Sequence, residues 1–132
     1  MLNKNIGDLM TKDVVTVDVD EDVVFAFEKL MKEKISSMPV IKDDDIVGIV
    51  TATDLGHNLI LDNYQLGTKV KDVMVKDVVT IDLNSTVSDA ILLMYNRAPG
   101  TGIINQLPVV KDGKIVGILS DGDLIKFIGS EI

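Results

Sequence analysis

Gly48-Ile49-Val50-Thr51-Ala52-Thr53-Asp54 joins the end of a predicted strand to the start of a predicted helix. The apolar run 46–50 is typical of a buried strand, and helical periodicity follows it. Thr51 stands three residues before Asp54, which is the spacing of a capping box. The Thr51 hydroxyl can accept a hydrogen bond from a first-turn N–H, and the Asp54 carboxylate can reach back to the cap. The simplest interpretation of one such pattern is a helix cap and nothing more.

The same pattern returns as Gly117-Ile118-Leu119-Ser120-Asp121-Gly122-Asp123. A helix that begins directly after a strand leaves unpaired N–H groups and a partial positive charge, which suit a phosphate group. An aspartate beside them can accept hydrogen bonds from two ribose hydroxyls. Because the pattern occurs twice, we favour a nucleotide-binding corner in each copy over a simple cap.

The rest of the chain is duplicated too. Residues 8–18 recur as 72–82, and residues 38–43 recur as 107–112. Each copy has the pattern of a β-α-β-β-α unit, so the predicted fold class is α/β. We predict a first repeat over 5–61, a linker over 62–69 and a second repeat over 70–129.

Within each repeat, capping residues, periodicity and turn residues give the element boundaries. Asp20 and Asn84 are the predicted N-caps of the first helices. Hairpin turns are predicted at 43–45 and 112–113, and the last helices from 54 to about 61 and from 123 to about 128. The residues predicted to face the sheet are Val23, Ala26, Phe27 and Leu30 in one repeat, and Val87, Ala90, Ile91 and Met94 in the other.

Both first helices carry further apolar residues outside that stripe: Val24, Phe25, Met31, Leu92, Leu93 and Tyr95. A helix that is apolar around much of its girth is usually buried on more than one side. Two interpretations remain open, a homodimer built on these helices or their burial against one another within one chain.

The two repeats differ at one loop. Residues 32–37 are replaced by the longer segment 96–106, which contains Arg97, the only arginine of the chain. Gly100-Thr101-Gly102 could expose backbone N–H groups to an anion. The alternative is a plain connector.

Composition excludes several classes of function. The chain has 132 residues, is 46% hydrophobic and carries a net charge of −8, which opposes binding to nucleic acid or anionic membranes. No apolar run is long enough to span a bilayer, and the first residues lack the charged and apolar regions of a signal peptide, so we expect a cytoplasmic protein. Cysteine is absent and His57 is the only histidine, an expected exposed helix residue, so we expect no metal site. We find no nucleophile-base pair or Walker-type loop, and we expect no enzymatic activity.

The repeated motifs resemble those of a tandem pair of cystathionine-β-synthase (CBS) domains, a Bateman module, over about residues 5–129. The matching stretches are 10–17, 37–40 and 48–55 with their second copies. The resemblance implies two halves packed with pseudo-two-fold symmetry through their sheets, two clefts and frequent dimers. It also implies adenosine-containing ligands: AMP, ADP, ATP or S-adenosylmethionine.

In the family pattern, each cleft joins the corner of one repeat to the early strand and pre-proline segment of the other. Carried onto this chain, one site combines Ser120 and Asp123 with Thr11, Val15, Ile35 and Ser36. The other combines Thr51 and Asp54 with Val79, Ile104 and Asn105. The aspartates would hold the ribose, the hydroxyls and helix amides the phosphate, and the aliphatic side chains the adenine. The pre-proline segments lack basic residues, which favours AMP or another lightly charged ligand.

The resemblance therefore predicts a sensor whose ligand occupancy changes its conformation and is transmitted to a partner protein, which the sequence does not identify. The alternative is a constitutive dimerisation module with no physiological ligand.

Overall fold

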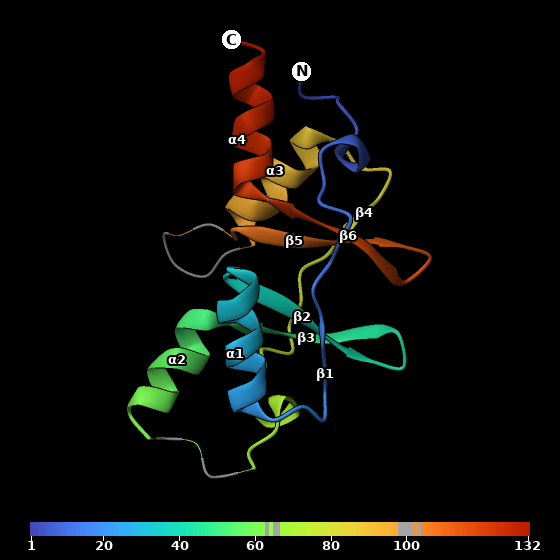
Figure 1. The fold of residues 1–132 in the computed structure, drawn as a ribbon. Coiled ribbons are helices and arrows are strands. Elements are labelled where there is room, and N and C mark those ends of the chain that lie inside the picture. The colour runs from blue at the N-terminus through green and yellow to red at the C-terminus, as the bar shows by residue number, and fades with distance from the viewer. Residues whose placement is uncertain (63, 65–66, 98–101, 103) are drawn as a thin grey trace. The chain divides into compact units, whose positions relative to one another are not determined.

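The computed structural model describes residues 1–62, 64, 67–97, 102 and 104–132, and these residues form a mixed α/β fold with two three-stranded sheets and four α-helices (Figure 1). The first half contains the 3₁₀ helix η1 (Ile6–Asp8), β1 (Val17–Asp18), α1 (Val23–Glu33), β2 (Ser37–Lys42), β3 (Asp45–Thr51) and α2 (Ala52–Ile60). The second half contains η2 (Val70–Asp72), β4 (Ile81–Asp82), α3 (Val87–Asn96), β5 (Gln106–Lys111), β6 (Lys114–Ser120) and α4 (Asp121–Ser130). The β-α-β-β-α order predicted for each repeat is confirmed, whereas the two 3₁₀ helices were not predicted. Among the described residues, no helix is long and apolar enough to cross a membrane.

The chain divides into two compact units that do not coincide with the two sequence repeats. One unit is 15–78, and the other combines 1–14 with 79–132. Each unit takes its 3₁₀ helix from the other repeat. Val70 of η2 is fully buried in the core of unit 15–78, and Ile6 of η1 is fully buried in the core of the other unit. The domain limits predicted from the repeats stay a prediction.

The two sheets have the same topology and the same irregularity. β1 is parallel to β2, with Val17 opposite Val40, and β2 is antiparallel to β3. The sheet β4-β5-β6 repeats this arrangement, with Ile81 opposite Val109. The register of each hairpin shifts at one corresponding position, between Val40 and Ile41 or between Val109 and Val110. The duplication seen in the sequence is therefore preserved in the strand register.

Both hairpins turn through two residues with positive φ. Asp43 and Asp44 have φ of 50° and 69°, and Asp112 and Gly113 have φ of 52° and 80°. Two successive positive φ values are the signature of a type I′ turn, which matches the right-handed twist of the flanking strands. The turn predicted at 112–113 is confirmed. The other turn is one residue shorter than predicted, since Asp45 already belongs to β3.

The predicted N-caps of α1 and α3 are wrong by two residues. The true caps are Asp22, whose side chain accepts from Val24 N, and Thr86, which forms a capping box with Asp89. The predicted caps instead lie in turns after β1 and β4, where the Asp20 N–H donates to Asp18 Oδ1 and the Asn84 N–H donates to Asp82 Oδ1, each at 2.9 Å. An aspartate that binds the backbone two residues later forms such a turn in its own right, so the helix starts later.

The predicted core stripes are largely confirmed. The fully or almost fully buried helix residues are Val23, Ala26 and Leu30 of α1 and Val87, Ala90 and Met94 of α3. Phe27 and Ile91 are partly buried against the same cores. Within unit 15–78, α1 and α2 lie side by side (Figure 1).

Candidate functional site

Each compact unit contains one of the two strand-to-helix corners. Thr51 ends β3 and caps α2, and its Oγ1 accepts from Asp54 N at 3.1 Å. Ser120 ends β6 and caps α4, and its Oγ accepts from Asp123 N at 3.1 Å. The caps predicted from the two hydroxyl-x-x-Asp patterns are confirmed.

The pre-proline residues lie beside the corner of their own unit. The Ala52 N–H donates to the Ser36 carbonyl and the Asp121 N–H donates to the Asn105 carbonyl, both at 2.8 Å. Each bond satisfies the first of the helix N–H groups that have no intrahelical partner. The structure thus ties each pre-proline residue to the corner of its own unit. The predicted pairing of each with the corner of the other repeat stays a prediction.

The segment that follows each 3₁₀ helix pairs with the strand that leads into the corner of the same unit. Thr11 exchanges two backbone hydrogen bonds with Ile118 of β6, at 2.8 and 2.9 Å, and Val75 does the same with Ile49 of β3, both at 2.9 Å. Thr11, a predicted site residue, is therefore paired with Ile118, which lies two residues before Ser120 in β6.

The segment that follows each 3₁₀ helix also passes close to the glycine at the start of each motif. A β-carbon on Gly48 would lie 2.4 Å from the sulfur of Met74, and one on Gly117 would lie 2.5 Å from the sulfur of Met10. The carbonyl oxygens of Val75 and Thr11 would each be 3.0 Å away. A side chain at either glycine would force the methionine to move and would crowd the carbonyl oxygen, so glycine favours this close pairing of the segment with the strand.

The predicted aliphatic site residues are all partly buried. Val15 and Ile35 pack against the core of unit 15–78, and Val79 and Ile104 pack against the core of the other unit. Unit 15–78 thus holds Val15, Ile35, Ser36, Thr51 and Asp54. The other unit holds Thr11, Val79, Ile104, Asn105, Ser120 and Asp123. Of the predicted anion-binding loop, Gly100 and Thr101 lie outside the described residues.

The two corners differ in the hydrogen bonds of their first helical turn. In α4, the Ser120 N–H donates to Asp123 Oδ2 at 2.9 Å, so the predicted return contact of the carboxylate is confirmed there. The Gly122 N–H also donates to Asp121 Oδ1 at 2.8 Å. With the Asn105 and Ser120 contacts, every N–H of residues 121–123 has an acceptor within the chain. This corner presents two carboxylates.

At the α2 corner, fewer of the first-turn N–H groups have an acceptor among the described residues. Its second position is Ala52, and among the described residues no acceptor is found for the Thr53 N–H. The return contact predicted for Asp54 is wrong, because the cap of α2 is made by Thr51 alone. Asp54 is exposed, so its carboxylate faces solvent. The α2 corner can therefore offer an N–H to an anion and a carboxylate to a diol.

Tyr64 is a feature of this unit that sequence reasoning missed. Its side chain is partly buried against the core of unit 15–78. This burial raises the pKa of the Tyr64 phenol, a hydrogen bond with Asn58 lowers it, and the negative charge of Asp54 raises it further. Tyr64 thus lies within electrostatic reach of the α2 corner, and its place in a predicted linker gave no signal of this.

The described residues include no group of His, Asp and Glu side chains that could hold a metal ion. His57 is exposed on α2, as predicted.

Comparison with known proteins identifies the same two repeats. The family model of the CBS domain matches residues 6–59 and 70–130. The chain is 32% identical over 118 residues to an inosine-5′-monophosphate dehydrogenase of Thermoplasma acidophilum, covering 89% of this chain. It spans only 22% of that enzyme, and 41% of the Methanocaldococcus jannaschii protein MJ1232.

Solved structures agree with the fold over almost the whole chain. The CBS domain protein NE2398 has a TM-score of 0.79 at 33% identity, covering 95% of this chain and 98% of its own. The protein CBSX2 of Arabidopsis thaliana, solved in complex with AMP, has a TM-score of 0.77 at 29% identity, covering 97% and 98%. The chain belongs to the CBS-domain family and contains one CBS match in each of its sequence repeats.

Proposed function

We propose that this chain is a regulatory module that binds an adenosine-containing ligand and transmits its occupancy to a partner protein by a change in conformation. The observation that carries the proposal is the pair of strand-to-helix corners, each with a hydroxyl cap and an aspartate one turn later. CBSX2, a relative with the same fold, has been solved with AMP. The ligands to test are AMP, ADP, ATP and S-adenosylmethionine.

The α2 corner is the better candidate for the phosphate of a nucleotide. Its Thr53 N–H is available, whereas the α4 corner satisfies its own first-turn N–H groups and adds the negative charge of Asp121. A carboxylate at a helix N-terminus competes with a bound anion for the same N–H groups and the same partial charge. AMP should therefore favour the corner of Thr51 and Asp54, with Val79, Ile104 and Asn105 as the proposed partners from the second repeat.

The α4 corner, with Thr11, Val15, Ile35 and Ser36, is proposed to take a ligand with little negative charge near the helix. Asp123 would still hold ribose hydroxyls with Oδ1, since Ser120 N occupies Oδ2. Each charge-assisted hydrogen bond of this kind contributes about 1.5–3 kcal/mol.

Titration calorimetry on protein shown to be nucleotide-free tests the proposal. We expect measurable heat with at least one of the four ligands and weaker binding of the 2′-deoxyribose analogue. Asp54→Ala or Asp123→Ala should weaken binding at its own site by at least about tenfold. Asp112→Asn is the matched control, because Asp112 lies in a hairpin turn with positive φ, which asparagine also adopts. Unchanged affinity in both aspartate variants would reject the assigned residues.

A second candidate function is a constitutive dimerisation module. It is favoured by the outward apolar residues of α1 and α3, since Phe25 and Tyr95 are 62% and 73% exposed. No heat with any of the four ligands, together with a dimer that forms without them, would support this alternative. In both cases we propose a homodimer and assign no catalytic activity to the chain.

A further inference from the structure

Unit 15–78 contains a hollow of about 420 Å³ that is separate from its corner. It is lined by Val19, Asp20, Lys42, Val47, Lys71, Asp72, Met74 and Lys76. Val47 lies near the start of β3 and Thr51 at its end, which places them about 13 Å apart at the rise of a strand. The volume falls in the range of small-molecule sites. The hollow is therefore not part of the proposed nucleotide site at the α2 corner.

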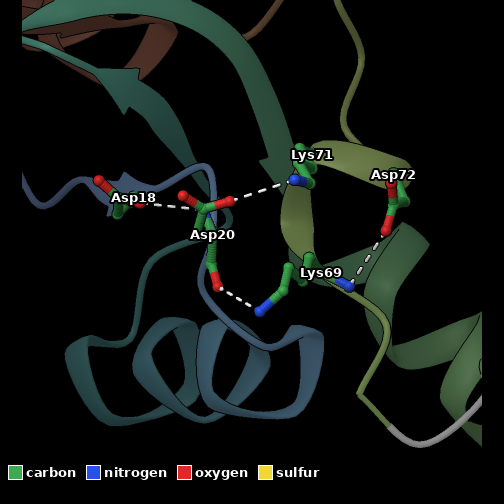
Figure 2. Close-up of polar contacts among 5 residues, drawn as sticks. All are labelled: Asp18, Asp20, Lys69, Lys71 and Asp72. Carbon is green, nitrogen blue, oxygen red and sulfur yellow. Dashed lines mark hydrogen bonds and ion pairs between the residues drawn. The ribbon is translucent and has the colours of Figure 1, made fainter.

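Three of the eight lining residues are lysines, although the chain as a whole has a net charge of −8. Lys71 Nζ forms an ion pair with Asp20 Oδ1 at 3.3 Å (Figure 2). Both side chains are at least half exposed, so this ion pair adds little stability and is easily exchanged. No ion pair is found for Lys42 or Lys76 in the part of the chain that the structure describes. The ammonium groups of Lys42 and Lys76 are therefore available to an anion, and that of Lys71 becomes available when the Asp20 side chain moves away.

The wall that carries Lys71 is held in place by contacts with the turn after β1. The Lys71 N–H donates to the Val19 carbonyl at 3.0 Å, and Lys69 Nζ donates to the Asp20 carbonyl at 3.2 Å. Figure 2 shows that Lys71 reaches the carboxylate of Asp20 and that Lys69 reaches its backbone carbonyl. The Lys69 N–H in turn donates to Asp72 Oδ2 at 3.4 Å. A wall fixed before binding costs less to order when a ligand arrives.

Comparison with the equivalent positions of the other unit shows which part of this cluster is particular to unit 15–78. Lys42 and Lys76 correspond to Lys111 and Lys12 in the duplicated sequence. Lys71 and Asp20 instead correspond to Gly7 and Asn84, so the ion pair has no counterpart. The unit of 1–14 and 79–132 thus supplies matched control positions for two of the three lysines.

We infer that this hollow binds a small phosphate-type anion through the ammonium groups of Lys42, Lys71 and Lys76. In the absence of the anion, the Asp20 carboxylate pairs with the Lys71 ammonium group, so Asp20 competes with the anion for Lys71. Val19, Val47 and Met74 provide an apolar surface for an uncharged part of the ligand. This site is independent of the proposed adenosine sites.

The test is an amide NMR titration of the whole chain with inorganic pyrophosphate. We expect saturable shifts at Val19, Asp20, Lys42 and residues 71–76. Lys71→Ala and Lys76→Ala should each weaken binding by about tenfold, the effect of losing one charge-assisted contact. Asp20→Asn should tighten binding by at least about threefold, because it removes the competing carboxylate.

The controls are Lys12→Ala and Lys111→Ala, which should change the affinity by less than about twofold. Repeating the titration with glycerol phosphate distinguishes an organic ester, which should also shift Val47, from inorganic phosphate. Shifts centred on Thr53 and Asp54 would assign the anion to the corner and overturn the inference. Absence of saturation, or weaker binding in Asp20→Asn, would overturn it as well.

Discussion

Ser120 and Asp123 hold each other at the start of α4, because the Ser120 N–H donates to Asp123 Oδ2 at 2.9 Å and the Asp123 N–H donates to Ser120 Oγ at 3.1 Å. Thr51 and Asp54 share only the second of these contacts at the start of α2. The two corners therefore share a sequence pattern, but only in the α4 corner does the aspartate side chain accept a hydrogen bond from the cap residue. One carboxylate is partly used for structure, and the other faces solvent.

This difference predicts unequal losses of stability in the ligand-free protein. Asp123→Ala should lower the free energy of unfolding by about 1 kcal/mol more than Asp54→Ala, because it removes one side of a reciprocal cap. Urea unfolding of nucleotide-free protein measures both values. Thr51→Ala and Ser120→Ala, which each remove one cap acceptor, should cost about 1 kcal/mol alike. Equal losses for the two aspartate variants would contradict the reciprocal contact.

The sequence was sufficient to predict the features that local chemistry determines. The caps at Thr51 and Ser120 and the turn at Asp112 depend on residues within four positions of one another, and the structure confirms them. The caps placed at Asp20 and Asn84 were wrong for a related reason. Several polar residues in this region can cap a helix, and the pattern alone did not show that Asp18 and Asp82 form a turn first.

Tertiary exchange between the repeats could not be predicted from local patterns. η1 and η2 have similar sequences, and each contributes a buried residue to the core built mainly by the other repeat. A 3₁₀ helix has the same pattern of apolar residues whether it packs against its own repeat or against the other, so the pattern does not reveal which core it joins. The asymmetry of the corners is visible in the sequence as Ala52 against Asp121. Its consequence depends on the direction of the Asp121 carboxylate, which accepts from the Gly122 N–H in the folded chain.

The close approach at the corner glycines predicts a loss of stability on adding one methyl group. Gly48→Ala should cost about 1–3 kcal/mol in the free energy of unfolding, since its β-carbon would overlap Met74. Gly129→Ala is the control, because nothing lies within 4 Å of that position in α4. Its stability should be unchanged or slightly higher. A Met74→Ala background should reduce the cost of Gly48→Ala, and strict additivity of the two changes would contradict the contact.

The proposed homodimer predicts that a charge on the outer face of α1 will dissociate it. Val24, Phe25 and Met31 are exposed on α1, and Leu92 and Tyr95 on α3, whereas Leu93 packs against the core of its own unit, contrary to its predicted outer position. Burying a glutamate without a partner is costly. Phe25→Glu should therefore shift the protein to monomer in sedimentation velocity runs.

Ile125→Glu is the matched control for the dimer, because Ile125 is 68% exposed on α4, outside the proposed interface. This variant should sediment as the unaltered chain does. Dissociation by Ile125→Glu with no effect of Phe25→Glu would move the interface away from α1 and α3. A monomer at every concentration of the unaltered chain would reject the dimer.

Tyr64 predicts a loss of stability in strongly alkaline solution. Its burial, with a smaller contribution from the charge of Asp54, raises the phenol pKa above the ordinary value of 10.0, against the hydrogen bond with Asn58. The folded state therefore favours the neutral phenol. This contribution to stability is complete below the unfolded pKa and is lost as the pH rises through the folded pKa. Tyr64→Phe should reduce the decline in the free energy of unfolding above about pH 10.

The Tyr95→Phe chain makes the Tyr64 pKa directly measurable, because the sequence contains two tyrosines. Its tyrosinate absorbance should rise with a midpoint above 10.0, and adding Asp54→Asn should lower that midpoint by removing a nearby negative charge. Asp112→Asn removes an equal charge from a hairpin turn of the other unit and serves as the control. A midpoint at or below the ordinary value would show that the phenol is solvated in the folded chain. A response to Asp112→Asn as large as that to Asp54→Asn would show that the shift reflects the net charge of the chain instead of the neighbourhood of α2.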